Sequence, residues 1–228
     1  IVLEPLASSQ AVLSPDEQEV GVVLVDIGGG TTDVTIYSEG SIVHTSVLAL
    51  GGNHLTHDIA IGLGAPLREA EDIKHKYGVA MASMVGEEEM IDVPSVGGRN
   101  NRTMQKRVLA SIIEDRFREI FELIAHEIEK THFHTLMASG VVITGGTCIM
   151  SGADRLASQV LNLPVRVGYP ENISGLREMI YSPKYATSVG LVRYGITSNQ
   201  GKLNFVGDDT NLFHKVSRRM KDWMQDFF

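Results

Sequence analysis

Short apolar runs and glycine-rich breaks alternate through the first fifty residues. Residues 22–27 form an apolar, β-branched run of strand length, and residues 33–37 alternate between apolar and polar side chains. Residues 41–50 are again apolar and β-branched, and the Glu-Gly pair at 39–40 before them is typical of a hairpin turn. The pattern therefore predicts strand, glycine loop, strand, turn and strand over residues 21–50.

The apolar spacing changes to a helical period after the third predicted strand. Residues 53–61 and 67–77 predict two helices, and residues 84–103 predict a loop. From Thr103 onward, apolar side chains recur at steps of one, three and four residues, which predicts one long helix. Its predicted buried face consists of Val108, Leu109, Ile112, Ile113, Phe117, Ile120, Phe121, Ile124 and Ile128.

A strand signature returns at residues 141–144, a Val-Val-Ile-Thr run that a second glycine pair follows. Residues 151–161 then predict a helix, and residues 165–167 predict a short strand. Two further helices are predicted near 174–180 and 186–194. Strands that alternate with helices in this way are typical of an α/β fold.

These elements predict a division of the chain into four parts. Residues 1–50 and 139–197 form one strand-rich unit, which a helical insertion over residues 51–138 interrupts. Residues 198–210 are polar and contain two glycines, so they predict a linker. The last part, 211–228, has a helical period of its own.

Residues 211–228 predict an amphipathic helix. At 100° per residue, the large apolar side chains fall on one half of the helix, and the other half carries four basic and two acidic residues. A basic, aromatic-rich helix behind a polar linker is typical of an anchor that lies in a membrane surface, where anionic lipids attract its cations. The alternative is a terminal helix that packs on its own domain or on a second copy. The predicted membrane-facing residues are Leu212, Phe213, Val216, Met220, Trp223, Met224, Phe227 and Phe228.

The chain of 228 residues is acidic, with 28 acidic and 20 basic side chains and a formal net charge of −8. This balance argues against a nucleic-acid partner, which would require a basic surface. A single cysteine, Cys148, cannot form an internal disulfide and favours a reducing compartment. The sequence contains no run of eighteen apolar residues, so no membrane-spanning helix is predicted, and no signal peptide is expected. Because the chain opens at Ile1 rather than Met, we expect the first part of a longer protein to be absent.

The first glycine loop lies within Asp26–Asp33, which reads Asp-Ile-Gly-Gly-Gly-Thr-Thr-Asp. Three consecutive glycines allow backbone N–H groups to converge on an anion, and the threonine hydroxyls add donors. Asp26, at the end of a strand, could hold a hydrated Mg²⁺ ion. No lysine follows the glycines, so the loop is not a Walker loop, and the strand after it excludes a dinucleotide fingerprint. A phosphate loop and a ligand-free turn both remain open.

The second glycine loop, Thr144–Thr147, follows a strand far along the chain and precedes a helix. Its backbone could lie flat beneath an adenine ring. An ordinary strand-to-helix turn is the simpler explanation of this loop taken alone. The two loops together favour a nucleotide site more strongly than either does.

Four segments resemble motifs of the superfamily that contains actin, Hsp70 and the sugar kinases. Asp26–Asp33 resembles its second phosphate motif, residues 141–147 its adenosine motif, and residues 185–191 its second connecting helix. Glu71 and Lys74 match a Glu-x-x-Lys segment that reaches the ribose and adenine in bacterial actins. The resemblance implies half of an actin/Hsp70-like, ribonuclease H-like ATPase fold with an inserted helical subdomain and a C-terminal amphipathic helix.

Within this superfamily, the chain is most similar to the bacterial cell-division family FtsA. The resemblance covers essentially the whole chain but only the second half of that family's fold. The segments that carry it are 58–60, 70–74, 93–99 and 182–187.

The FtsA resemblance implies a cytoplasmic adaptor that binds ATP and Mg²⁺ and is at most a weak ATPase. It would polymerise like an actin, hold the tubulin-like protein FtsZ at the cytoplasmic face of the inner membrane at the division site, and recruit later division proteins. One alternative is a cell-shape actin of the MreB type, and another is a sugar or acid kinase. No residue of the sequence suggests the catalytic base that a kinase requires.

The resemblance also implies roles for individual residues. Asp26 would position the hydrated Mg²⁺ ion. The expected nucleotide contacts are Gly28, Gly29, Gly30, Thr31 and Thr32 to the β- and γ-phosphates, Glu71 and Lys74 to the ribose and base, and Gly145, Gly146 and Thr147 to the adenine, with Gly52 and Asn53 completing the set. The FtsZ-facing surface would lie on the helical insertion, where an acidic peptide could meet Arg99, Arg102 and Arg107.

Overall fold

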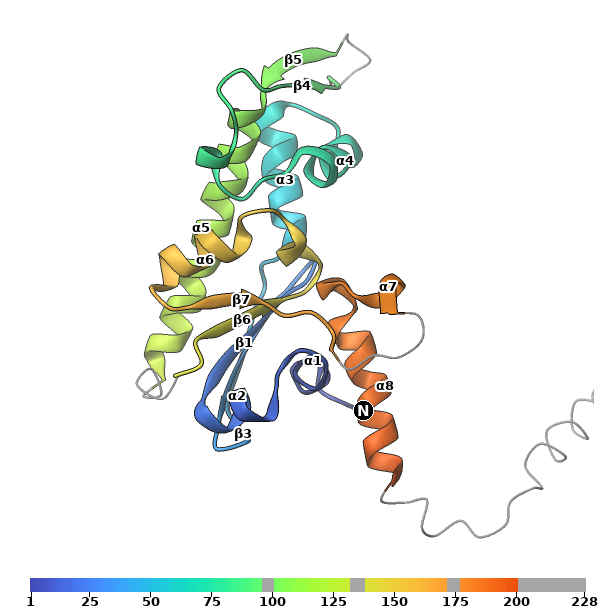
Figure 1. The fold of residues 1–228 in the computed structure, drawn as a ribbon. Coiled ribbons are helices and arrows are strands. Elements are labelled where there is room, and N and C mark those ends of the chain that lie inside the picture. Colours follow the sequence, from blue (N-terminus) through green and yellow to red (C-terminus); the bar gives the residue numbers. More distant parts are fainter. Residues whose placement is uncertain (96–100, 132–137, 172–176, 201–228) are drawn as a thin grey trace, which may run out of the picture. The chain divides into compact units, whose positions relative to one another are not determined.

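The computed structural model describes residues 1–95, 101–131, 138–171 and 177–200. These residues belong to two compact units, Ile1–Leu191 and Val192–Phe228, and the second is described only through residue 200. The first unit contains a central sheet with helices on both faces and a helical region beyond one edge of the sheet (Figure 1).

The central sheet has five strands in the order β3-β2-β1-β6-β7. Strands β1, β2 and β3 form an antiparallel meander, whereas β6 pairs in parallel with β1 and β7 in parallel with β6. The strands predicted within residues 21–50, 141–144 and 165–167 are thereby confirmed. Their bounds are β1 Val22–Ile27, β2 Thr32–Ser38, β3 Ser41–Leu48, β6 Val141–Thr144 and β7 Val165–Val167.

The two faces of the sheet are covered by different helices. The side chains of Val23, Val25 and Ile27 belong to the main core, together with those of the long helix α5 (Lys106–Lys130) and of α6 (Ala153–Leu161). The alternating side chains, such as Leu24, belong to a smaller cluster with the helix α1 (Glu4–Val12) and the start of α8 (Ala186–Gln200). Residues of opposite parity on a strand thus face opposite layers, as the pleat requires.

The helical region follows β3. Helices α3 (Gly52–Leu63) and α4 (Leu67–Tyr77) confirm the two helices predicted there. Gly64 ends α3 in the left-handed conformation with φ 58°, a common helix stop. Helix α5 runs from this region along the sheet (Figure 1). Its predicted apolar stripe is buried from Leu109 to Ile128 except for the half-buried Ile112, whereas Val108, also predicted to be buried, is 39% exposed.

The structure corrects the prediction for residues 84–103 and for the start of the long helix. A two-stranded antiparallel hairpin forms from β4 (Met90–Val93) and β5 (Arg102–Gln105), and α5 begins at Lys106 rather than Thr103. In β4, the buried Ile91 and Val93 alternate with exposed neighbours, which is a strand pattern. The pattern spans only four residues.

The first twenty residues contain two helices, in a stretch for which the sequence predicted no element. Helix α1 is followed by α2 (Pro15–Val20), where Ser14 and Glu17 form a reciprocal capping box. Helix α8 extends through the first three residues of the expected linker. The remaining short elements among the described residues are the 3-10 helices Ala82–Met84, Gly146–Ile149 and Pro183–Tyr185 and the helix α7, Arg177–Ile180.

Candidate functional site

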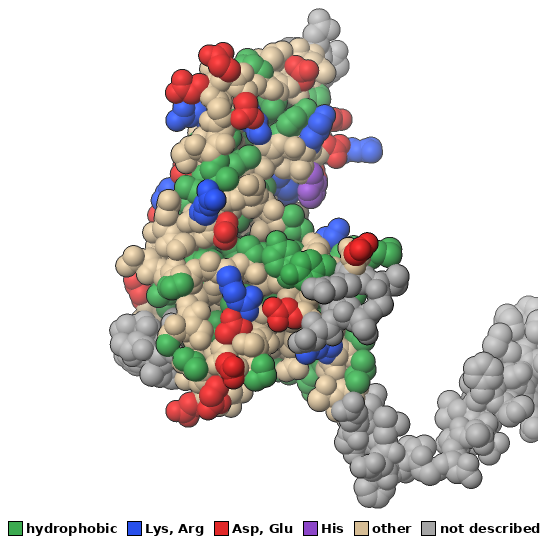
Figure 2. Space-filling view, in the orientation of Figure 1, with side chains coloured by type: hydrophobic (Ala, Val, Ile, Leu, Met, Phe, Trp, Pro, Cys, Tyr) green, Lys and Arg blue, Asp and Glu red, His purple; other side chains and the backbone are tan. Residues whose placement is uncertain are grey.

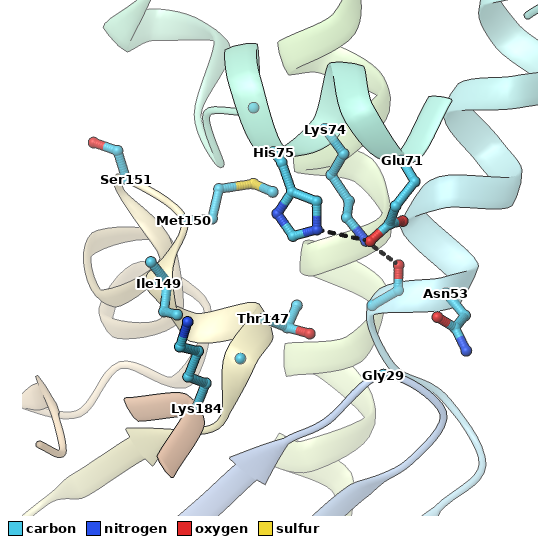
Figure 3. Close-up of a pocket in the computed structure, with 13 residues that line it drawn as sticks. Gly29, Asn53, Glu71, Lys74, His75, Thr147, Ile149, Met150, Ser151 and Lys184 are labelled. Atoms are coloured by element: carbon cyan, nitrogen blue, oxygen red, sulfur yellow. Dashed lines mark hydrogen bonds and ion pairs between the residues drawn. The ribbon is translucent and has the colours of Figure 1, made fainter. Parts of the chain in front are cut away.

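A pocket of about 510 Å³ lies where the carboxyl ends of β1 and β6 face helix α4. The space-filling view shows the molecule hollowed between the helical region and the sheet region, with a histidine at the rim of the hollow (Figure 2). Five segments of the chain contribute to the lining (Figure 3). The lining residues are Gly29, Gly52, Asn53, Glu71, Lys74, His75, Gly78, Gly146, Thr147, Ile149, Met150, Ser151 and Lys184.

The two glycine loops meet because β1 and β6 are parallel neighbours. Their last paired residues are Asp26 and Thr144, so both strands end at the same edge of the sheet. Gly145 has φ 94°, and a Cβ there would lie 2.4 Å from the carbonyl oxygen of Ile27, so only glycine fits this position. The hydroxyl of Thr147 donates to the carbonyl oxygen of Gly28 at 2.9 Å and joins the loops directly.

The first glycine loop is held through its carbonyl groups. Gly28 and Gly29 accept hydrogen bonds from the backbone N–H groups of Gly52 and Asn53 at 2.9 and 2.7 Å. Residues 29–31 are exposed, and a Cβ at Gly30 would meet no atom within 4 Å. The fixed carbonyls leave an open stretch of backbone that can receive an anion.

Helix α4 supplies the charged wall. Lys74 is only 8% exposed, and its ammonium group donates to the carbonyl of Gly52 at 3.0 Å and to the hydroxyl of Thr56 at 2.8 Å. The same ammonium group lies 2.8 Å from Oε2 of Glu71, while Nε2 of His75 lies 2.9 Å from Oε1. Burial raises the pKa of Glu71, but the hydrogen bonds from Lys74 and Thr56 outweigh burial and hold the pKa below its usual value. Glu71 is therefore an oriented carboxylate at the pocket wall.

The opposite wall carries two apolar side chains beside the polar Ser151 and the cationic Lys184 (Figure 3). Ile149 and Met150 line it, and the Met150 side chain reaches Gly78 at the end of α4, where an added Cβ would lie 2.9 Å from the methionine methyl carbon. The N–H group of Ala80 donates to the carbonyl of Ser151 at 2.9 Å and closes this end of the pocket. An apolar slot at one end and open glycine backbone at the other suit a ligand with a flat ring and an anionic tail.

The pocket brings together seven of the predicted nucleotide residues, one set from each predicted segment: Gly29, Gly52, Asn53, Glu71, Lys74, Gly146 and Thr147. Gly28, Gly30 and Gly145 adjoin these residues in the chain and Thr31 lies two positions from Gly29, but none of the four lines the pocket. Thr32 is fully buried, and its hydroxyl donates to the carbonyl of Leu50 at 2.8 Å, so this side chain braces the loop from inside.

Asp26 points to the face of the sheet that α1 covers. It is 6% exposed and accepts a hydrogen bond from the hydroxyl of Ser8 at 2.6 Å, with the hydroxyl of Thr187 at 3.4 Å. Burial raises the pKa of Asp26, and the neighbouring charge of Glu4 adds to this effect against the hydrogen bonds. Its partner across the strands, Asp33, has its pKa raised to about 6 by burial and by the charges of Glu4 and Asp26.

This crowding of carboxyl groups fits a weakly held, hydrated cation, because a positive charge would relieve the repulsion. Within the part of the chain that the structure describes, no group of three or more His, Cys, Asp or Glu side chains could itself hold a metal ion.

Some residues of the site were not predicted from the sequence. Thr56 and His75 each follow a predicted residue by four positions on a helix, Gly52 and Glu71 respectively, and that spacing could have identified them. Ser8 had no such signal. Met150 lies between the predicted adenosine motif and the predicted helix over 151–161, and Lys184 lies in segment 182–187, which carried only the family resemblance; both line the pocket.

The structure describes two of the three arginines predicted to contact FtsZ. Arg102 donates from its guanidinium group to the carbonyl of Leu63, and Arg107 lies 3.5 Å from Glu87 on the surface. Arg99 and the predicted membrane-facing residues from Leu212 to Phe228 lie outside the described residues. None of the helices in the described ranges is long and apolar enough to cross a bilayer.

Comparison with protein families shows to which family the chain belongs. The family model described as "Cell division protein FtsA" matches residues 23–190. The chain belongs to the FtsA family. It is therefore related to actin-like cell-division proteins, as the motifs predicted, and the loops and α4 of the pocket lie within the matched range.

Several FtsA proteins are similar over the whole chain or most of it. The FtsA of Pseudomonas aeruginosa is 41% identical over 233 residues, and that of Escherichia coli K12 is 39% identical over 236 residues, each covering 100% of this chain and 56% of the relative. The FtsA of Neisseria meningitidis is 45% identical over 193 residues, covering 84% of this chain and 47% of the relative. The chain thus spans about half the length of the FtsA proteins it matches.

Solved structures confirm the predicted actin-like α/β fold. MreB5 of Spiroplasma citri bound to ADP has a TM-score of 0.71 at 20% identity and covers 90% of this chain and 62% of its own. The ethanolamine utilization protein EutJ of Carboxydothermus hydrogenoformans has a TM-score of 0.56 at 24% identity and covers 82% of this chain and 52% of its own. At such identities, the likeness shows the fold alone.

Proposed function

We propose that this FtsA-family chain binds ATP, with a hydrated Mg²⁺ ion, in the pocket between its two glycine loops and helix α4. The observation that carries the proposal is the hydrogen bond between Thr147 and Gly28, which holds the loops together beside Glu71 and Lys74. Crystals of MreB5, which shares the fold, contain ADP or AMPPNP. These neighbours support nucleotide binding as the function of this pocket.

The geometry suggests how the nucleotide would be bound. The exposed backbone of residues 29–31 would receive the β- and γ-phosphates, since glycine backbone approaches an anion without interference from a Cβ. Glu71 would accept a hydrogen bond from a ribose hydroxyl. The base would lie on Gly146 with Ile149 and Met150 beside it.

Asp26 would hold the hydrated Mg²⁺ ion through water. When bound, the ion would neutralise phosphate charge and the repulsion among Glu4, Asp26 and Asp33. The same repulsion means that Mg²⁺ must compete with protons, so its affinity should fall as the pH drops below about 6, where Asp33 is protonated.

The role of the full-length protein is proposed from its family. It would polymerise like an actin, hold FtsZ at the cytoplasmic face of the inner membrane at the division site, and recruit later division proteins. Residues 211–228 would form the membrane anchor, because their apolar and basic residues separate onto two faces of a helix. Arg99, Arg102 and Arg107 would meet an acidic peptide of FtsZ on the helical region.

The nucleotide site is tested by adding one charge beside the phosphates. In Gly30→Asp, the new carboxylate enters open space, so the fold should be kept and ATP affinity should fall at least about tenfold by repulsion. Gly30→Asn adds a side chain of the same size without the charge, so its loss of ATP affinity should be clearly smaller than that of Gly30→Asp. Calorimetric titration of the full-length protein measures both. Equal affinities for the Asp and Asn variants would contradict the proposal.

The anchor and the FtsZ surface are tested separately. Deleting residues 211–228 should abolish sedimentation with anionic liposomes and leave the thermal unfolding midpoint of the folded part unchanged. Undiminished liposome binding would rule out the anchor. Reversing the charges of Arg99, Arg102 and Arg107 should weaken FtsZ binding, whereas Arg155→Glu, on exposed α6 surface, should not.

A further inference from the structure

Three backbone segments meet at the carbonyl group of Gly28. Its oxygen accepts the N–H group of Gly52 at 2.9 Å and the hydroxyl of Thr147 at 2.9 Å. Gly52 begins helix α3, and Thr147 lies in the short 3-10 helix of the second glycine loop. One carbonyl therefore links the first loop, helix α3 and a residue 119 positions away.

The atoms around this carbonyl leave no room for a Cβ on Gly51 or Gly52. A Cβ at Gly52 would lie 2.6 Å from the Thr147 hydroxyl oxygen, and a Cβ at Gly51 would lie 2.7 Å from the Gly28 oxygen. Contacts this short essentially never occur for a real Cβ, so the segments can approach only as glycines. Their separation is thus set by direct contact.

The linkage extends to the charged wall. The carbonyl of Gly52 accepts a hydrogen bond from the ammonium group of Lys74, which also binds Glu71. A continuous line of bonds runs from Glu71 through Lys74 and Gly52 to Gly28 and Thr147. Among these partners, Thr147 alone belongs to the loop predicted to lie under the base.

We propose that Thr147 is a positioning residue, whose hydroxyl fixes the spacing between the loop that holds the phosphates and the loop that lines the base. The inference rests on the proposed ATP site and assigns Thr147 a different role in it, since its hydroxyl is committed to Gly28 rather than to adenine. A ligand that spans both loops gains from a spacing set in advance, because no ordering cost remains at binding. A ligand that touches only the base loop gains nothing from it.

Thr147→Val should separate these two kinds of ligand. Valine keeps the shape but removes the donor, and the Gly28 oxygen keeps its bond from Gly52, so the fold should persist. In the full-length protein, we expect the affinity for ATP to fall about three- to tenfold, as for the loss of one net hydrogen bond, and the affinity for adenosine to change less than about twofold. Thr147→Ser, which restores the hydroxyl, should recover ATP affinity.

Two further arms keep the test decisive. Thr103→Val removes a hydroxyl bound to Asp92 in the distant β4–β5 hairpin and should leave both affinities unchanged. Without any nucleotide, the amides of Gly52 and Asn53 should exchange their hydrogens several-fold faster in Thr147→Val, because the carbonyls they bind are less firmly held.

Wild-type ATP affinity in Thr147→Val, or an equal loss for ATP and adenosine, would overturn the inference and leave the ATP site in place. A wild-type protein that binds no ATP would instead overturn the proposed function. The amide exchange would then decide alone whether Thr147 holds the loops, and unchanged exchange would refute it.

Discussion

The two faces of the central sheet differ in the share of polar side chains that they bury. On one face, β1, β2 and β6 pack apolar residues against α5 and α6 in a continuous hydrophobic core. On the other, a small apolar cluster is surrounded by buried polar groups, among them Ser8, Ser9, Asp26 and Thr35. The same strands thus supply stability through one set of alternating side chains and polar chemistry through the other.

The polar face is stable because its buried groups bond to one another. The phenol of Tyr37 donates to the hydroxyl of Ser9 at 2.7 Å, and Ser8 donates to Asp26. Buried polar groups cost little when they are paired and much when they are not. This face therefore tolerates carboxyl groups near the proposed Mg²⁺ position, which an apolar core would exclude.

The largest expected effect lies on the apolar face. Phe117, fully buried on α5 and stacked on Phe121 with ring centroids 5.6 Å apart, should cost about 3–5 kcal/mol of unfolding free energy when changed to alanine. Urea unfolding followed by circular dichroism measures this loss. Leu123→Ala, on the exposed side of the same helix, should cost less than about 1 kcal/mol. Similar losses for both variants would show that the faces of α5 do not differ as described.

A smaller effect, of opposite sign and dependent on pH, is expected on the polar face. Because the folded pKa of Asp33 is raised to about 6, the folded state binds its proton more tightly than the unfolded state. The free energy of unfolding should therefore fall as the pH rises from about 4 to about 6. Asp33→Asn removes this penalty and should stabilise the protein by about 1–3 kcal/mol at pH 7 and by little at pH 4.

Unfolding curves of the wild type and of Asp33→Asn at pH 4 and 7 test this difference. Asp72→Asn, at an exposed position on α4, removes the same formal charge and should show no comparable change between the two pH values. A gain for Asp33→Asn that is equal at both pH values would mean that the charge of Asp33 is not its cause.

The smallest effect concerns one hydrogen bond of the polar face. Tyr37→Phe removes the phenol that binds Ser9 and should cost about 1 kcal/mol. A double-mutant cycle with Ser9→Ala isolates the pair, and the two losses should be less than additive because both variants remove the same bond. Strict additivity would show that the bond contributes nothing to stability.

The two faces also differ in how far the sequence predicts them. The apolar face follows from periodicity, so the strands from Val22 to Leu48 and the long stripe of α5 were predicted nearly to their ends. Helix α1 was missed because its buried residues include Ser8 and Ser9, which carry no amphipathic signal. The β4–β5 hairpin was missed because each strand has four residues, too few for a clear alternation.

The candidate site also has a part that the sequence predicts and a part that it does not. Glycine spacing predicted both loops, and the superfamily motif predicted Glu71 and Lys74. The bond from Thr147 to Gly28 and the Ser8 contact of Asp26 link residues 119 and 18 positions apart, and no local pattern encodes such pairs. The sequence thus predicts which segments contribute, whereas tertiary packing decides which atoms face the pocket.

The parallel pairing of β1 with β6 also makes the molecule modular. The excursion that leaves the sheet after β3 returns to it beside β1, so its two ends are anchored to the same rigid platform. An engineer could lengthen, shorten or exchange the distal β4–β5 hairpin without displacing either glycine loop, provided that α3 and α4 are retained. Diversification of such a scaffold would accordingly begin at its outermost tip and spare the platform.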